Sequence, residues 1–111
     1  MKSTESEIKE EYRQLCKELS KTGWISSGYA QNRGPGAGGP CYQWSRKIRA
    51  KTVSVALSEE QFIWLQQAIA NQRKIKQILQ RMEELSRTIL FKTIKGTNRR
   101  KPLSKNVMGI I

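Results

Sequence analysis

The sequence predicts an α+β fold with an N-terminal helix, a small antiparallel β-hairpin or three-stranded sheet, a long C-terminal helix and a disordered basic tail. Three observations predict it. Apolar residues recur at helical spacing in two segments, they alternate with polar residues over residues 41–57, and a glycine-rich run separates the first helix from the alternating segment. We therefore expect a single small domain over residues 1–91 and a tail over residues 92–111.

The first helix is expected to begin after Thr4 and to end near Gly23. Thr4 is followed three residues later by Glu7, the spacing of a capping box. The residues that this helix would bury lie on one face, at successive spacings of four, three and four residues: Ile8, Tyr12, Leu15 and Leu19.

The segment between the first helix and the hairpin contains two different patterns. Aromatic and β-branched residues in residues 23–30 could form a short strand. The run of glycine and proline in residues 34–40 can form neither a helix nor a sheet ladder, so we expect a loop there.

The hairpin is predicted from two alternating runs that flank Arg49 and Ala50. Tyr42 and Trp44 alternate with polar residues before this connection, and Val53 and Val55 alternate after it. Alanine is a poor residue for a two-residue hairpin turn, because such turns need positive φ angles. The turn is expected either to be longer than two residues or to be strained.

The long helix is expected over residues 58–91, because neither proline nor glycine interrupts them. Ser58 and Gln61 have the spacing of a second capping box. The second half of the helix carries a heptad-like apolar seam: Ile75, Ile78, Met82, Leu85 and Ile89. We expect this seam to pack antiparallel against the first helix or to pair with another copy or another protein.

The hairpin and the start of the long helix resemble a family of small uncharacterised prokaryotic proteins. The resemblance rests on Gly-Pro-Cys-Tyr-Gln-Trp-Ser-Arg-Lys-Ile at residues 39–48, on Lys-Thr-Val at residues 51–53 and on Leu-Ser-Glu-Glu-Gln at residues 57–61. It implies a hairpin followed by a long helix, and some members look like companions of mobile genetic elements. Many members carry a cysteine-rich knuckle before the Gly-Pro. Residues 31–38 have no cysteine, so a metal site of that kind is not expected here.

The charge of the chain is strongly positive and unevenly distributed. Its formal net charge is +12, and residues 23–57 and 92–111 contain basic residues but no acid. Such segregation favours a polyanionic partner, and nucleic acid is the commonest one in cells. The alternative is that the charge merely keeps the protein soluble.

The residues expected to contact phosphates lie in the hairpin and in the tail. They are Arg46, Lys47, Arg49, Lys51, Arg99, Arg100 and Lys101. Tyr42 and Trp44 could stack on unpaired bases, or they could face the long helix and form the core. No sequence-reading DNA- or RNA-binding motif is present, so the choice between DNA and RNA stays open.

Other functional classes find little support in the sequence. Without histidine there is no side chain that ordinarily titrates near neutral pH, and two widely spaced cysteines cannot complete a zinc site. We expect no enzyme activity, no cofactor, no metal and no small-molecule substrate. The absence of a long apolar run predicts no membrane span, and we expect a cytoplasmic protein with free thiols.

The sequence therefore predicts a non-enzymatic nucleic-acid-binding accessory protein. Two alternatives remain open at this stage. One is an adaptor or homodimer that pairs through the seam of the long helix, and the other is a component of a ribonucleoprotein.

Overall fold

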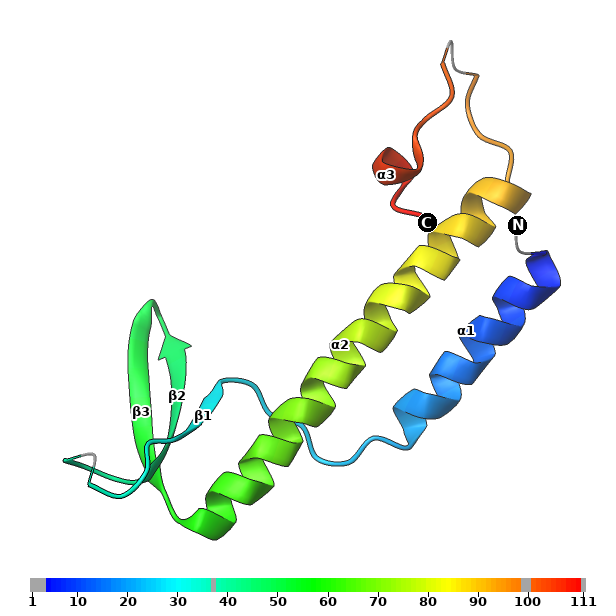
Figure 1. Cartoon of the computed structure of the whole chain (residues 1–111). Helices are drawn as coiled ribbons and strands as arrows, with labels where there is room; N and C mark the ends of the chain where they lie inside the picture. The colour runs from blue at the N-terminus through cyan, green and yellow to red at the C-terminus, as the bar shows by residue number, and fades with distance from the viewer. Residues whose placement is uncertain (1–3, 37, 99–100, 111) are drawn as a thin grey trace. The chain divides into compact units, whose positions relative to one another are not determined.

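The computed structural model describes residues 4–36, 38–98 and 101–110. Its elements follow in the order α1 (Glu5–Ser20), β1 (Tyr29–Asn32), β2 (Tyr42–Ile48), β3 (Lys51–Leu57), α2 (Glu59–Thr93) and α3 (Lys105–Met108). The fold is α+β, with an N-terminal helix, a three-stranded antiparallel sheet and a long helix, as the sequence predicts (Figure 1).

The chain divides into two compact units. One, the helical unit, contains the residues up to Lys21 and those from Lys76 onwards. The other, the sheet unit, is Thr22–Ile75 and contains the three strands. The first part of α2 belongs to the sheet unit and its remainder to the helical unit.

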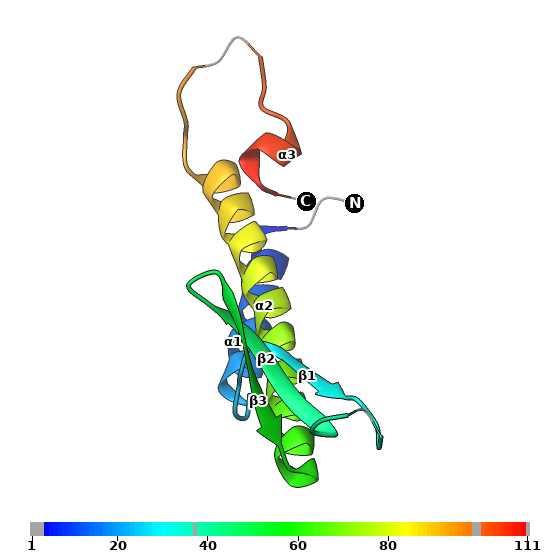
Figure 2. The same cartoon turned by 90° about the vertical axis from the view of Figure 1, so that its left-hand side faces the viewer.

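In the helical unit, α1 packs antiparallel along the second part of α2 (Figures 1 and 2). Thr4 caps α1, and its hydroxyl accepts a hydrogen bond from the Glu7 amide at 3.2 Å. Ile8 on α1 and Leu85 on α2 are buried, with 4% and 3% of their surfaces exposed. The antiparallel packing expected from the seam is therefore present within a single chain.

An ion pair links the two helices of this unit. The Nη2 atom of Arg81 donates to Oε1 of Glu11 at 3.0 Å, and its Nε atom donates to the other carboxylate oxygen. The hydrogen bond from Arg81 holds the pKa of the Glu11 carboxyl below its ordinary value. About two fifths of the Glu11 side chain is exposed, so solvent screens much of this attraction.

The sheet unit has the strand order β1-β2-β3, and both pairings are antiparallel. The Tyr42 ring of β2 lies 4.9 Å from the Phe62 ring of α2, centroid to centroid. Among the described residues of this unit, the buried apolar ones are Phe62, Ala68 and Ile69. The sheet therefore packs on the first turns of α2 mainly near the Tyr42 end of its strands.

The start of α2 is fixed by a reciprocal capping box. The Ser58 amide donates to the Gln61 side chain at 2.9 Å, and the Gln61 amide donates to the Ser58 hydroxyl at 3.1 Å. From there α2 runs 35 residues to Thr93, slightly beyond the predicted end.

Two segments differ from the sequence prediction. The strand expected within residues 23–30 lies at Tyr29–Asn32 instead. The backbone before it is engaged by α2, because the Asn71 side chain donates to the Trp24 carbonyl at 2.9 Å and the Ser26 amide donates to the Ala68 carbonyl at 3.2 Å. These bonds use groups that a strand would need for its ladder.

The second difference concerns the tail, where disorder was expected. Lys92 and Thr93 continue α2, and Lys105–Met108 forms the short helix α3 between the N-cap Ser104 and the left-handed C-cap Gly109. The Arg87 side chain donates to the Gly109 carbonyl at 3.2 Å. The segment that follows α3 thus contacts α2 at Gly109, which a reading of the charge alone does not predict.

The hairpin turn has two residues, both with positive φ. The φ angles are 49° at Arg49 and 66° at Ala50, the sign that a type I′ turn requires. Side chains with a Cβ atom are strained in this region, by about 1–2 kcal/mol each. The strain that the sequence suggested is therefore present in the turn.

Replacing Ala50 by glycine should stabilise the sheet unit. We expect the free energy of unfolding to rise by about 0.5–1 kcal/mol, because glycine relieves the strain at a partly offsetting entropic cost. Urea denaturation followed by tryptophan fluorescence measures this, since Trp24, Trp44 and Trp64 all lie in this unit. The matched control Ala70→Gly, in α2, should instead lose about 1 kcal/mol. Equal destabilisation by both changes would contradict the strained turn.

The Glu11–Arg81 pair predicts a small pH-dependent contribution to the helical unit. Because the folded-state pKa of Glu11 is lowered, the stabilisation is present above its unfolded-state pKa and is lost as the pH falls through the folded value. Glu11→Gln should reduce the free energy of unfolding by about 1 kcal/mol or less at pH 7, and the deficit should shrink in acid. Thermal unfolding followed by circular dichroism measures it.

The control for this prediction is Glu83→Gln. Glu83 contacts Arg87 within α2 and does not link the helices. A deficit of the same size and pH dependence in both variants would mean that the inter-helix pair has no specific role.

Candidate functional site

The two faces of the sheet differ in chemistry because of the strand register. Cα partners across β2 and β3 are Tyr42 with Leu57, Trp44 with Val55, Arg46 with Val53 and Ile48 with Lys51. Side chains alternate along a strand, so these eight residues share one face. Since Tyr42 contacts Phe62, this is the face toward α2, and we call it the inner face. The outer face carries the aromatic Tyr29 of β1 and otherwise small or polar residues: Gln31, Gln43, Ser45, Lys47, Thr52, Ser54 and Ala56.

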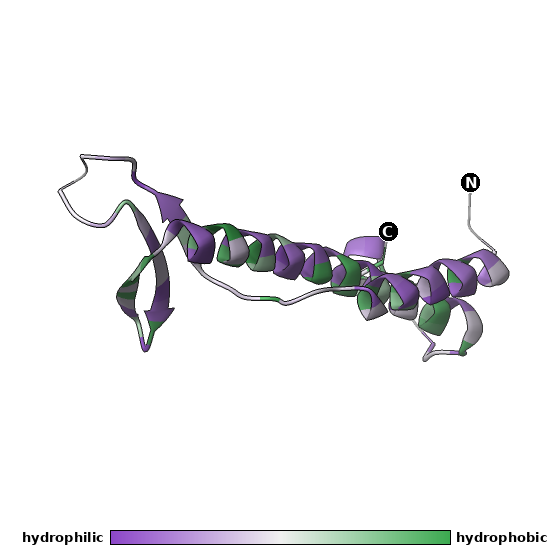
Figure 3. Ribbon diagram, turned by 90° about the horizontal axis from the view of Figure 1, so that it is seen from below, coloured by the Kyte–Doolittle hydropathy of each residue, from purple (hydrophilic) through white to green (hydrophobic). Residues whose placement is uncertain are grey.

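The four predicted phosphate contacts of the hairpin are all exposed but do not share a face. Arg46 and Lys51 lie on the inner face, Lys47 lies on the outer face opposite Thr52, and Arg49 lies in the turn. They therefore surround the turn end of the hairpin. That end stands clear of the other elements of the sheet unit (Figures 1 and 3).

Tyr42 and Trp44, the predicted base-stacking residues, are engaged within the protein. Besides its contact with Phe62, Tyr42 has a pKa raised above its ordinary value, mainly by burial and secondarily by the charge of Glu59. The Trp44 indole donates to the Ser27 carbonyl at 2.9 Å, and the Arg46 guanidinium lies 4.9 Å from its ring centroid. The contact of Tyr42 with Phe62 is the one that the core interpretation expects, whereas Trp44 contacts Ser27 and Arg46, and Val53 and Val55 beside the two rings are exposed.

Of the three predicted tail contacts, only Lys101 lies within the residues that the structure describes. Arg99 and Arg100 lie outside the residues that the structure describes. Lys101 is exposed, in the connection that leads to α3.

The predicted helix-pairing seam is largely covered by the chain itself. Ile78 and Leu85 have only 5% and 3% of their surfaces exposed. Ile75, Met82 and Ile89 are half-buried. Because α1 lies along this part of α2 (Figure 1), another helix could reach the centre of the seam only after α1 moved away.

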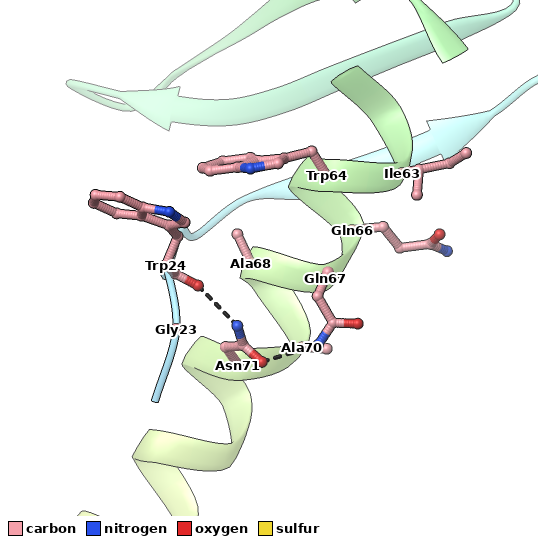
Figure 4. A pocket seen from close by; sticks show the side chains of 9 residues that line it. All are labelled: Gly23, Trp24, Ile63, Trp64, Gln66, Gln67, Ala68, Ala70 and Asn71. Atoms are coloured by element: carbon pink, nitrogen blue, oxygen red, sulfur yellow. Dashed lines mark hydrogen bonds between the residues drawn. The ribbon is translucent and has the colours of Figure 1, made fainter. Parts of the chain in front are cut away.

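A groove that the sequence did not predict lies on the first part of α2. It encloses about 590 Å³ and includes Trp24, Trp64, Ala68 and Asn71 in its lining. Figure 4 shows the Trp64 indole extending toward that of Trp24, with the small Ala68 side chain below the space between them. Trp24 is 75% exposed and Trp64 is 54% exposed.

The position of Trp24 is fixed through its backbone rather than its ring. Asn71 donates to the Trp24 carbonyl and accepts from Gln67 at 3.0 Å. One signal could have identified Trp64 in advance, because it lies beside the apolar stripe of Phe62, Leu65 and Ile69 and not within it. A large aromatic residue off the apolar stripe of a helix is expected to be exposed.

Within the described residues, no three or more histidine, cysteine, aspartate or glutamate side chains come together in a way that could hold a metal ion. Cys16 and Cys41 are free thiols. No helix in the described part of the chain is long and apolar enough to cross a membrane.

Comparison of the chain with known protein families, with curated proteins and with solved structures finds no match.

Proposed function

We propose that this protein is a non-enzymatic nucleic-acid-binding protein whose basic hairpin contacts the phosphate backbone. The observation that carries the proposal is the group of four exposed cations around the turn end of the hairpin, Arg46, Lys47, Arg49 and Lys51. No acid occurs between residues 22 and 58 to neutralise them. A projecting two-stranded ribbon with cations on both faces and at its turn suits insertion against a phosphate backbone.

The wider charge of the sheet unit supports the same proposal. Residues 22–75 contain seven basic residues and two acids, Glu59 and Glu60. Both acids lie in the first turn of α2, where the helix dipole stabilises negative charge. The hairpin is therefore the most positive part of the unit, and binding should depend steeply on salt.

The alternative of helix pairing has less support. Its seam would have to exchange the intrachain contacts of Ile78 and Leu85 for equivalent contacts with a partner. The gain in free energy would then be small unless α1 found a new partner as well.

The first test compares hairpin and helix cations. Full-length protein is titrated against labelled duplex DNA, single-stranded DNA and structured RNA at several salt concentrations. Lys47, Arg49 and Lys51 are changed together to glutamine, while Arg46 is kept because it packs on Trp44. We expect affinity to fall about tenfold or more, and the slope of log K against log salt to decrease by about 0.9 for each lost phosphate contact on duplex DNA.

The matched control removes the same charge elsewhere, with Arg73, Lys74 and Lys76 changed to glutamine. It should retain most of the affinity. Equal losses in both variants would indicate general charge attraction and would contradict a hairpin site. In a third variant, Arg99, Arg100 and Lys101 are changed to glutamine. This change removes charge from the tail but keeps the contact between Arg87 and Gly109, whereas a chain ending at Phe91 would lose both.

The groove predicts a preference for unpaired bases. Bases could stack on Trp24 and Trp64, whose rings are exposed, more readily than on the engaged rings of Tyr42 and Trp44. Trp24→Ala and Trp64→Ala should each weaken binding of an oligothymidylate by about 1–3 kcal/mol and leave duplex binding nearly unchanged. Fluorescence anisotropy of the labelled oligonucleotide measures this.

Tyr29→Ala serves as the matched control for the groove, because Tyr29 is exposed and lies on the outer face of the sheet. If it weakens single-strand binding as much as the tryptophan variants do, the groove has no special role.

A further inference from the structure

The outer edge of β3 is an unprotected strand edge. The sheet order places β3 at one end, and within the described residues no strand pairs with its far side. All residues of Lys51–Leu57 except Leu57 are exposed. The strand has seven residues, contains no proline, and carries no charge after Lys51. Proteins usually protect such an edge, because its free backbone groups pair readily with another strand.

The hairpin geometry identifies the free backbone groups. Ile48 and Lys51 flank the two-residue turn and form the closing hydrogen-bonded pair. Hydrogen-bonded and non-hydrogen-bonded pairs alternate along an antiparallel ladder. The amides and carbonyls of Thr52, Ser54 and Ala56 therefore point away from β2, toward the free edge.

We propose that β3 pairs antiparallel with β3 of a second copy of this chain, with the two-fold axis at Ser54. In this register Ser54 lies opposite Ser54 of the second copy, and Thr52 lies opposite its Ala56. All three outward residues of each strand then form hydrogen-bonded pairs. The two three-stranded sheets become one six-stranded sheet.

The side chains fit this register on both faces. Val53 lies opposite Val55 of the second copy on the inner face, in a non-hydrogen-bonded pair, where side chains are closest. These valines are 39% and 46% exposed in the single chain, and the pairing would cover part of each. On the outer face only small residues meet, so nothing obstructs the approach.

The charges at the two ends of β3 also favour a second copy. Arg49 and Lys51 lie at its start, and the two acids of the sheet unit, Glu59 and Glu60, follow its end. Antiparallel pairing places Lys51 opposite Leu57 of the other copy, near that copy's two acids. Opposite charges therefore meet at both ends of the interface, whereas a parallel pairing would align like charges.

The experiment uses a charge exchange at the two-fold axis. Size-exclusion chromatography with light scattering should give the wild-type chain twice its monomer mass of 12.8 kDa. Ser54→Lys and Ser54→Glu, each alone, place like charges opposite each other and should give monomers. An equimolar mixture of the two variants should restore a dimer. Gln31→Lys places the same charge on the same face of β1, at the other edge of the sheet, and should leave the dimer intact.

A second measurement needs no variant. Amide hydrogen exchange of the wild-type chain should show protection of Thr52, Ser54 and Ala56 at high protein concentration and loss of protection on dilution. A wild-type monomer with unprotected amides at these positions would overturn the proposal. So would a dimer that persists in both single variants, because another surface would then hold it. The proposal does not rest on nucleic-acid binding. None of these results would support or contradict nucleic-acid binding, which the titrations described above test separately.

Discussion

The contact between Tyr42 and Phe62 determines how the sheet unit presents its residues. It joins β2 to the first turn of α2 with ring centroids 4.9 Å apart. Side chains of a strand alternate between faces, so placing Tyr42 toward the helix also places Trp44, Arg46 and Ile48 there. A shift of one residue would exchange the two faces completely. Because this contact turns the Tyr42 side of β2 toward the helix, Gln43, Ser45 and Lys47 lie on the outer face.

The same contact explains why so much apolar surface stays exposed. Tyr42 lies at the end of β2 away from the turn, so α2 covers that end of the sheet, while Val53, Val55 and Ile48 extend beyond the covered area. In the described part of the sheet unit, the buried apolar residues are Phe62, Ala68 and Ile69. A unit with so small a core has little stability to spare. Additional burial through β3 would therefore stabilise the unit as well as form an interface.

The parts of the fold that could be predicted from the sequence are those set by local chemistry. Thr4 and Ser58 mark helix starts because their hydroxyls accept hydrogen bonds from amides three residues ahead. The alternation of residues 42–57 likewise predicts β2 and β3 from local information, because the two alternating runs and the turn that joins them are adjacent in the chain. The position of β1 could not be predicted, because Asn71, 47 residues away from Trp24 in sequence, decides which backbone groups remain for pairing.

In the candidate site, too, the features set by local sequence could be predicted and those set by long-range contacts could not. The positions of Lys47 and Lys51 on opposite faces follow from alternation alone. The engagement of Trp44 does not, because its indole donates to a carbonyl 17 residues earlier. Similarly, the charge pattern of the tail gave no indication of α3, whose end is held by Arg87 of α2. Long-range hydrogen bonds thus decide which of the predicted residues remain available to a partner.

Of the four cations of the proposed binding surface, only Lys51 lies within β3, the strand of the proposed interface. In a dimer joined through β3, Lys51 lies near Glu59 and Glu60 of the other copy and would be partly neutralised there. Phosphate contact would then fall mainly to Lys47 and Arg49, which lie on the outer face and in the turn, and to Arg46. The salt dependence per chain should consequently be weaker than four free cations would give, by about 0.9 in slope. Two hairpins related by the two-fold axis would at the same time act on one nucleic acid, so the dimer exchanges one contact per chain for bivalent attachment.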